Sequence, residues 1–192
     1  MAKFLIAGLG NPGAEYTATR HNIGFDVADW LVFKHGGRFK TEKMGDLAEL
    51  KIRGNLVYCI KPSTFMNLSG LAVKYWMDRE KIGRDHLLIV VDDLALPLNR
   101  LRLRASGSDA GHNGLKSIQG VLGTDNYPKL RFGIGNEFPK GMQVAFVLGK
   151  WKPEELAMVR LKIEKSAEVI ESFVGLGIEK TMNQYNKLEI TT

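Results

Sequence analysis

Apolar residues are distributed along the chain in two patterns that predict different elements. Short apolar runs are typical of strands, whereas apolar residues repeated every three or four positions are typical of one face of a helix. The two patterns alternate along the chain, which favours an α/β sandwich of layers. We expect six strands, at residues 3–8, 47–52, 56–61, 87–91, 101–104 and 130–134.

Four segments between and after these runs are predicted to be helical. The first follows His21, the second follows Asn67, and the third begins near Asn113. The most regular segment lies after Pro153, where apolar residues recur at three- and four-residue spacing. No linker separates these elements, so we expect one domain over residues 1–192.

Composition is that of a compact globular protein without covalent cross-links. With 192 residues, 44% of them apolar, the chain can bury a core without disulfides or a structural metal. The only cysteine, Cys59, lies in an apolar run, which predicts a buried inert thiol and a reducing compartment. No apolar stretch approaches the ~20 residues of a membrane span. We therefore expect a cytoplasmic protein without a membrane anchor.

The charge balance favours a polyanionic partner without identifying one. Lys and Arg total 27 against 21 Asp and Glu, giving a net charge of +6, although solvated basic faces explain such a balance equally well. Arg100, Arg102 and Arg104 alternate with leucines, which places the three guanidinium groups on one face of an extended segment. That face is either a phosphate-binding stripe or a charged edge that prevents aggregation.

Polar clusters follow three of the predicted strands at the point where each strand ends. They are Asn11-Pro12-Gly13, the segment 63–67, and Asp92-Asp93. In open α/β sheets, ligands bind in the crevice at the carboxyl ends of parallel strands. If these strands are parallel, the three clusters converge on one site.

The first of these clusters overlaps a glycine pattern that suggests a dinucleotide site. Residues 8–13 match G-x-G-x-x-G after a strand, but that fingerprint requires a helix to open at the glycines. Here Asn11-Pro12-Gly13 predicts a turn, and the helical pattern begins only near His21. We therefore interpret the glycines as allowing a tight turn that exposes Asn11.

Several polar residues have both a chemical and a structural interpretation. His21 lies near a helix start, where the helix dipole keeps an imidazole in its base form, and Asp92 could orient that imidazole. A surface histidine, and a turn cap or magnesium site at Asp92-Asp93, are the alternatives. Asn67 and Asn113 are either helix caps or amide donors to an oxyanion or an attacking water.

Six motifs in a fixed order carry more information than any one residue. They are Gly8–Gly13, Tyr16 with Thr19–Asn22, Lys61–Gly70, Gly111–Lys116, Leu130–Gly135 and Phe146–Lys150. Taken together, they closely resemble the motifs of the bacterial peptidyl-tRNA hydrolase family, over nearly the whole chain.

The resemblance implies both a fold and an activity. The fold would be a monomeric α/β domain with a twisted mixed sheet flanked by helices, with no metal and no cofactor. The activity would be hydrolysis of the ester joining a peptide to the 3′ end of tRNA, which frees the tRNA for translation. The competing class is a non-catalytic RNA-binding protein of the same fold. A magnesium-dependent phosphoesterase using Asp92 and Asp93 is a third possibility, but the sequence lacks a wider set of carboxylate ligands.

The same resemblance implies roles for the polar residues of the predicted site. His21 would be the general base acting on water, and Asp92 would stabilise its charged form. Asn11 would hold the peptide part of the substrate. Asn67 and Asn113 would bind the 3′ end and polarise the ester carbonyl or position the water.

The remaining implied roles concern substrate binding. Tyr16, Phe65 and Met66 would shape the pocket around the peptide and the terminal adenosine. Arg104 and Arg131 would form a clamp on the 5′ phosphate of the tRNA.

The sequence departs from the usual family pattern at a few positions. Relatives often carry an acid at the position of Ala95, and a histidine or arginine at that of Asn136. The approach to His112 is also less glycine-rich here. These departures leave the implied base and its partner in place, and concern the RNA contacts instead.

Overall fold

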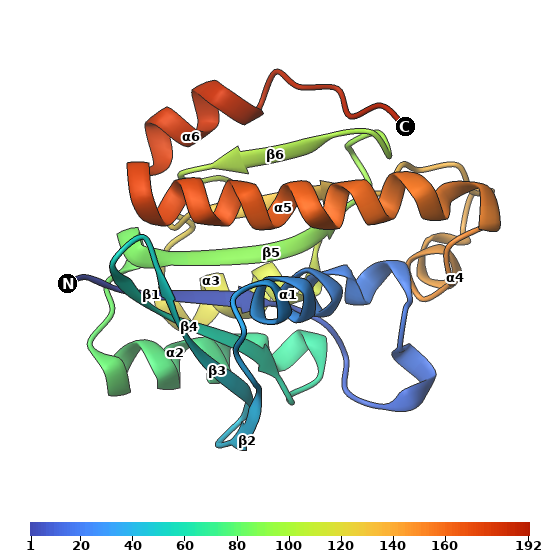
Figure 1. The fold of residues 1–192 in the computed structure, drawn as a ribbon. Coiled ribbons are helices and arrows are strands. Elements are labelled where there is room, and N and C mark those ends of the chain that lie inside the picture. The colour runs from blue at the N-terminus through green and yellow to red at the C-terminus, as the bar shows by residue number, and fades with distance from the viewer.

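Seven strands form one mixed sheet in the computed structural model, which describes residues 1–192 (Figure 1). The strands are β1 (Lys3–Gly8), β2 (Lys40–Glu42), β3 (Gly45–Ile52), β4 (Asn55–Pro62), β5 (Leu87–Asp93), β6 (Leu101–Arg104) and β7 (Lys129–Gly133). Their order across the sheet is β2-β3-β4-β1-β5-β7-β6. The central strands β4, β1, β5 and β7 are parallel, and the outer strands pair antiparallel with their neighbours. The expected mixed α/β architecture is confirmed.

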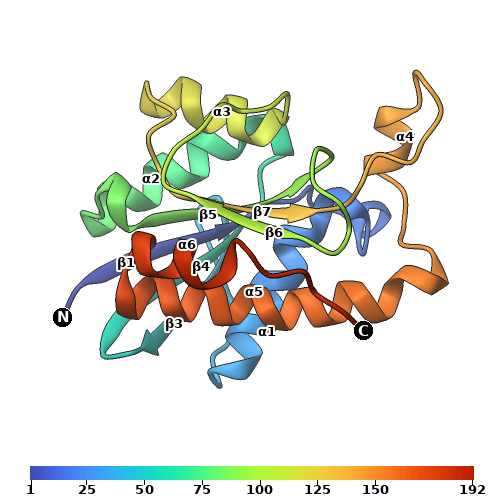
Figure 2. The ribbon, with the colours of Figure 1, turned by 90° about the horizontal axis from the view of Figure 1, so that it is seen from above.

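Helices cover both faces of this sheet. They are α1 (Ile23–Lys34), α2 (Ser69–Glu80), α3 (Asn113–Leu122), α4 (Gln143–Val147), α5 (Leu156–Leu176) and α6 (Ile178–Tyr185). Figure 2 shows α1 and α5 on one face and α2 and α3 on the other. None of the helices combines the length and hydropathy that crossing a lipid bilayer would require.

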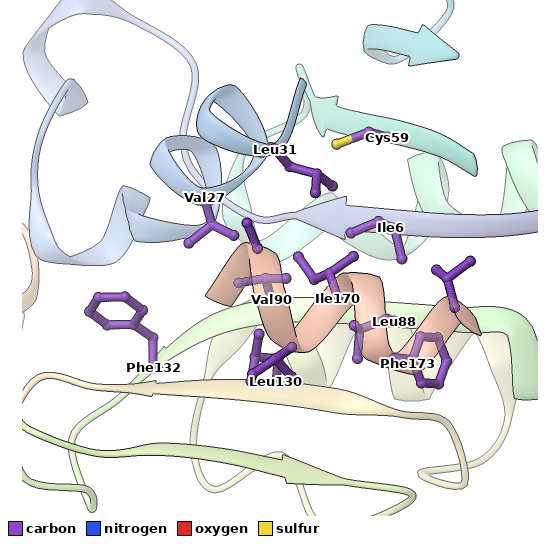
Figure 3. Close-up of a cluster of buried hydrophobic side chains, with 14 of the residues drawn as sticks. Ile6, Val27, Leu31, Cys59, Leu88, Val90, Leu130, Phe132, Ile170 and Phe173 are labelled. Carbon is purple, nitrogen blue, oxygen red and sulfur yellow. The ribbon is translucent and has the colours of Figure 1, made fainter. Parts of the chain in front are cut away.

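Each face of the sheet has its own apolar core. Ile6 of β1 packs with Val27 of α1 and Ile170 of α5 on one face (Figure 3), while Leu5 packs with Trp76 of α2 on the other. Successive strand residues point to opposite faces, so a strand covered by helices on both sides is apolar throughout. This is why β1, β4 and β5 contain uninterrupted apolar runs in the sequence, whereas β7 carries Lys129 and Arg131 on one face.

The six expected strands and four expected helices are all present, and three short elements were missed. Strand β2 has three residues, all exposed, helix α4 has no buried residue, and helix α6 buries only Thr181. Strand β2 and helix α4 are too short to carry much periodic signal. Helix α6 does carry one, because Ile178, Met182 and Tyr185 recur at helical spacing and pack against the core, and this signal was overlooked. Cys59 lies fully buried in β4, and burial raises the pKa of its thiol to about 12, in agreement with an inert side chain.

The outer edge of strand β6 is covered by the C-terminal part of the chain. Helix α6 lies alongside β6 (Figure 1), and Asn186 follows it. The Asn186 side chain accepts a hydrogen bond from the Leu103 backbone N–H at 2.8 Å and donates one to the Leu103 carbonyl at 2.9 Å. A side-chain amide thus occupies the place of a neighbouring strand.

The backbone of helix α1 lies directly against strand β1 at two glycines. A Cβ on Gly8 would lie 2.0 Å from the Gly24 carbonyl oxygen, and a Cβ on Gly24 would lie 2.3 Å from the Leu9 nitrogen and 2.7 Å from the Val90 oxygen. Of the glycines between residues 8 and 24, only Gly13 has a positive φ, of 115°. The tight-turn interpretation therefore holds for Gly13 but is wrong for Gly8, which permits close packing instead.

Replacing Gly24 tests whether this close approach matters to the fold. Gly24→Ala should lower the free energy of unfolding by about 1 to 3 kcal/mol, because the added methyl group meets backbone atoms that cannot rotate away. The matched control is Gly120→Ala in α3, where no atom lies within 4 Å of the added Cβ. That change should stabilise the protein by about 0.5 to 1 kcal/mol. Urea unfolding measures both, and equal effects would contradict the packing argument.

Helix α5 carries a lysine whose side chain is entirely buried. Lys162 Nζ donates a hydrogen bond to the Gly133 carbonyl at 2.6 Å and lies 3.9 Å from the centre of the Phe132 ring. No carboxylate pairs with it, and burial lowers the pKa of Lys162 to about 6. The amine is therefore mostly neutral in the folded protein at neutral pH.

The lowered pKa of Lys162 makes stability depend on pH. In the unfolded chain the amine stays protonated up to a pKa of about 10.4, so between pH 7 and 9 unfolding takes up a proton. The free energy of unfolding should therefore rise with pH over that range, by up to about 1.4 kcal/mol per unit from this group. Lys162→Met should flatten the rise, whereas Lys165→Met, on the partly exposed side of the same helix, should not. Urea titrations at several pH values would contradict this if both variants kept the slope of the parent protein.

Candidate active site

The three polar clusters predicted from the sequence meet at one cavity. Asn11 follows β1, the segment 63–67 follows β4, and Asp92 lies at the end of β5. These three strands are parallel neighbours, so their carboxyl ends lie side by side. The cavity has a volume of about 620 Å³. Its lining includes the five polar residues expected at the site, which are Asn11, His21, Asn67, Asp92 and Asn113.

His21 and Asp92 form a hydrogen-bonded pair in this cavity. His21 lies in a 3₁₀ turn, Arg20–Asn22, immediately before α1, and its Nδ1 is 2.9 and 3.1 Å from the two carboxylate oxygens of Asp92. Asp92 is only 5% exposed. An ionised carboxylate can only accept hydrogen bonds, so the proton of the neutral imidazole lies on Nδ1. The Nε2 atom of His21 is left with its lone pair.

A second histidine contacts the same carboxylate, and sequence reasoning gave it no role. His112 Nε2 lies 3.0 Å from Asp92 Oδ1, while its Nδ1 accepts hydrogen bonds from the backbone N–H groups of Gly114 and Leu115. Because a backbone N–H can only donate, the proton of neutral His112 lies on Nε2 and is donated to Asp92. The signals in the sequence were its place in the motif Gly111–Lys116 and its position directly before the predicted third helix.

The two histidines keep Asp92 ionised although it is buried. Burial by itself raises the pKa of the Asp92 carboxyl, but the hydrogen bonds from His112 and His21 outweigh it. The pKa of Asp92 therefore lies well below its usual range. A fixed negative charge thus faces the His21 ring.

The donor set does not suit a metal ion. One potential ligand atom from each of His21, Asp92 and His112 lies within 4.8 Å of the others, which is close enough to surround a cation. A metal-bound imidazole must offer an unprotonated nitrogen. In His112 the unprotonated nitrogen already caps α3, and the other nitrogen carries the proton that Asp92 accepts.

Asp93, the second acid of the predicted cluster, has a structural contact instead. Its Oδ1 accepts a hydrogen bond from the Ala95 backbone N–H at 2.8 Å, and its Oδ2 lies 3.8 Å from Arg131 Nη1. The carboxylates of Asp92 and Asp93 are thus both engaged within the protein. This argues against the magnesium site considered from the sequence.

Hydrogen bonds hold both the side chain and the backbone of Asn11 in place. Its Oδ1 accepts a hydrogen bond from the Met66 backbone N–H at 2.7 Å, which leaves the Nδ2 group as a donor. The side chain of Asn22 exchanges two hydrogen bonds with the Asn11 backbone, at 2.8 and 2.9 Å. Asn22 was not predicted as part of the site, and its position in the motif 19–22 was the only hint.

Asn67 and Asn113 are both exposed and line the cavity, and neither caps a helix. The residue at the cap position of α2 is Leu68, and α3 is capped by the imidazole of His112. The capping interpretation of both asparagines is therefore wrong. Their role as amide donors to the substrate stays a prediction.

The residues expected to bind substrate are not all at the cavity. Phe65, exposed, and Met66, buried, line it. Tyr16 does not; it ends the 3₁₀ turn Ala14–Tyr16, where its carbonyl accepts a hydrogen bond from the Thr19 hydroxyl.

The two arginines of the expected clamp differ in their surroundings. Arg131 lines the cavity but is buried, and its Nη2 donates to the Ser108 carbonyl at 2.6 Å. Arg104 lies exposed at the end of β6, outside the cavity.

One wall of the cavity comes from a segment that the sequence did not identify as part of the site. Helix α4 and the residue after it contribute four side chains to the lining. We call these four residues the α4 wall: Gln143, Val144, Val147 and Leu148.

The chain is similar to one family over nearly its whole length. A family model described as peptidyl-tRNA hydrolase matches residues 5–192. A peptidyl-tRNA hydrolase from Parabacteroides distasonis is 53% identical over 184 residues, covering 96% of this chain and 98% of the relative. One from Bacteroides fragilis is 52% identical over 185 residues, with 96% and 99% covered. The crystal structure of a peptidyl-tRNA hydrolase from Acinetobacter baumannii matches with a TM-score of 0.91 and 34% identity, over 97% of this chain and 95% of that one.

The double role of His112 can be separated by two substitutions. His112→Ala removes both the helix cap and the bond to Asp92, so it should lower the free energy of unfolding by about 2 to 4 kcal/mol. His112→Asn keeps a good capping side chain and should cost only about 1 to 3 kcal/mol, for the lost bond to the carboxylate. Urea unfolding at pH 7 compares them. Equal losses would show that the imidazole cap adds nothing to stability.

Proposed function

Because the chain belongs to the peptidyl-tRNA hydrolase family, we propose that it hydrolyses the ester bond between a peptide and the 3′ end of tRNA and so releases tRNA for translation. The observation that carries this proposal is the His21–Asp92 pair at the cavity. A buried, ionised carboxylate binds one nitrogen of an imidazole whose other nitrogen retains its lone pair. This is the arrangement of a general base.

The reaction needs a proton to move from water to His21 and then to the leaving group. His21 Nε2 takes a proton from a water molecule as the water oxygen attacks the carbonyl carbon of the ester. Asp92 stabilises the imidazolium that forms. The bond between the carbonyl carbon and the ribose oxygen then breaks, and the imidazolium returns its proton to that oxygen. The products are a tRNA with a free 3′-terminal ribose hydroxyl and a peptide carboxylic acid, which at neutral pH loses its remaining proton to solvent and becomes a carboxylate.

The amide side chains of the cavity supply the donors for this chemistry. Asn11 holds the peptide part of the substrate through Nδ2, whose position is fixed by the hydrogen bond that Oδ1 accepts. Asn67 and Asn113 donate to the developing oxyanion or to the water. Phe65 and Met66 form the apolar surface for the peptide and the terminal adenosine. Tyr16, which lies outside the cavity, would meet only parts of the substrate that extend beyond it.

Arginines on strands β6 and β7 provide the surface for the tRNA backbone. Arg102 pairs with Arg131 and Arg104 with Lys129 across the two strands, so all four side chains point to the face of the sheet that carries α2 and α3. Lys129 is fully buried there and donates to backbone carbonyls, which leaves the phosphate contacts to the arginines. Arg104, exposed at the strand end, and Arg131, at the cavity, would hold the 5′ phosphate. A chain that binds its substrate in this way can act as a monomer in the cytoplasm.

The alternative, a non-catalytic RNA-binding protein, would require neither the His21 tautomer nor the charge on Asp92. Incubation with N-acetylated and free aminoacyl-tRNA, followed by separation of the released tRNA, tests the proposal. We expect release from the N-acetylated substrate and much less from the free one. Binding of both substrates without release would favour the alternative.

Substitutions of the pair test whether His21 and Asp92 act as one unit. His21→Ala should remove most of the chemical step, and Asp92→Asn should lower the rate by about 10² to 10⁴. The double variant should be scarcely slower than His21→Ala, because an aspartate that acts through the imidazole has no function without it. Single-turnover hydrolysis measures the rates.

Both variants must remain folded and bind tRNA for this comparison to hold. Circular dichroism and filter binding provide those controls. Losses that multiplied independently in the double variant would show that Asp92 has a separate function.

A further inference from the structure

The α4 wall, formed by Gln143, Val144, Val147 and Leu148, has few buried contacts within its own helix. Helix α4 has five residues and none of them is fully buried; Phe146 and Val147 pack against the apolar core only in part, so the helix is anchored less firmly than the longer helices. Figure 2 shows α4 projecting beyond the layers of sheet and helices. The wall must therefore depend on specific contacts outside the helix.

Those contacts come from Arg20. Its side chain is buried, with 4% of the residue exposed, and Nη1 donates a hydrogen bond to the Phe146 carbonyl at 3.1 Å. The guanidinium carbon lies 4.1 Å from the centre of the Phe146 ring and 5.4 Å from that of Trp151. Cation–π contacts of a desolvated arginine are among the stronger examples of their kind. The Arg20 side chain thus holds α4 through both its main chain and its aromatic ring.

Main-chain hydrogen bonds reinforce the attachment at the same place. The Arg20 backbone N–H donates to the Gly149 carbonyl at 3.0 Å, and Thr19 forms a β-bridge with Lys150. The residue after Arg20 is His21, so the same short turn carries both the proposed base and the residue that contacts the α4 wall.

The charge of Arg20 is balanced by the carboxylate of Glu155, the residue directly before helix α5. Nη2 lies 3.2 Å from Glu155 Oε1, which also accepts the Lys152 backbone N–H at 2.8 Å. Removing one partner of a buried ion pair leaves an uncompensated charge, so this contact is not readily given up. Arg20 therefore joins three segments that are far apart in the sequence: the turn of the base, the α4 wall and the start of α5.

We propose that Arg20 is a positioning residue that fixes the α4 wall over the cavity, so that substrate affinity depends on it more than the chemical step does. The valine and leucine side chains of the wall would contact apolar parts of the substrate. The statement about affinity rests on the proposed function. The statement that Arg20 holds the wall does not.

Two measurements on Arg20→Met test the proposal. With N-acetyl-aminoacyl-tRNA as substrate, KM should rise about tenfold, while the single-turnover rate at saturation should stay within about twofold of the parent value. In hydrogen exchange, the backbone amides of Phe146, Leu148 and Gly149 should lose protection, and those of the central strands β1 and β5 should not. Arg20→Lys keeps the charge beside Glu155 and should restore part of the affinity.

A matched control is available on helix α2. Arg79 also lies over an aromatic ring, 5.0 Å from that of Trp76, and pairs with Glu80 at 3.7 Å, but it is exposed and outside the cavity. Arg79→Met should leave KM, the saturated rate and the exchange of α4 unchanged. If Arg20→Met fails to fold, Phe146→Leu, at a partly buried position, should give the same pattern with a smaller rise in KM.

Two outcomes would overturn the proposal. A fall in the saturated rate with KM unchanged would mean that Arg20 acts on His21 and not on the wall. Unchanged exchange of the α4 amides would mean that other contacts hold the wall. If the parent protein bound but did not hydrolyse the substrate, the proposed function would fail while the exchange measurement still decided whether Arg20 holds the wall.

Discussion

The close contact between the backbones of α1 and β1 sets the geometry of the whole site. Gly8 and Gly24 leave no room for a Cβ on either side, so the helix approaches the sheet more closely than side chains would allow. The turn that carries His21 immediately precedes this helix, and Asp92 ends the strand next to β1. A hydrogen bond weakens steeply with distance, so the 2.9 Å contact between them depends on a packing distance set elsewhere.

The cap of helix α3 makes the two histidines of the site chemically different. Both donate a hydrogen bond to Asp92, but His112 also uses its second nitrogen to accept backbone N–H groups. His21 has no such contact, so only its ring keeps a lone pair for the cavity. In the proposed reaction, the choice between the two rings is thus made by a helix terminus that the substrate need not touch. Both histidines lie beside the same carboxylate, so proximity to Asp92 alone does not distinguish them.

The sequence predicted those parts of the structure that follow from periodicity and strand order. Apolar runs located the central strands, and the rule for parallel strands brought Asn11, residues 63–67 and Asp92 together. His112 was missed because histidine is an uncommon cap and the neighbouring Asn113 has the more usual residue type. The α4 wall was missed because a helix of five residues with no buried face has no pattern to detect. Single residues also left their functional alternatives open, and only the order of the motifs pointed to the family.

The contact between Asn186 and strand β6 has a consequence for how the protein behaves in concentrated solution. The outermost strand of a sheet can pair with strands of other molecules if its peptide groups are free. Here the amide of Asn186 occupies the N–H and carbonyl of Leu103, and helix α6 lies alongside the same strand. A chain cut by a protease after residue 177 would lose both, and would present an open template for intermolecular β-sheet and hence for precipitation.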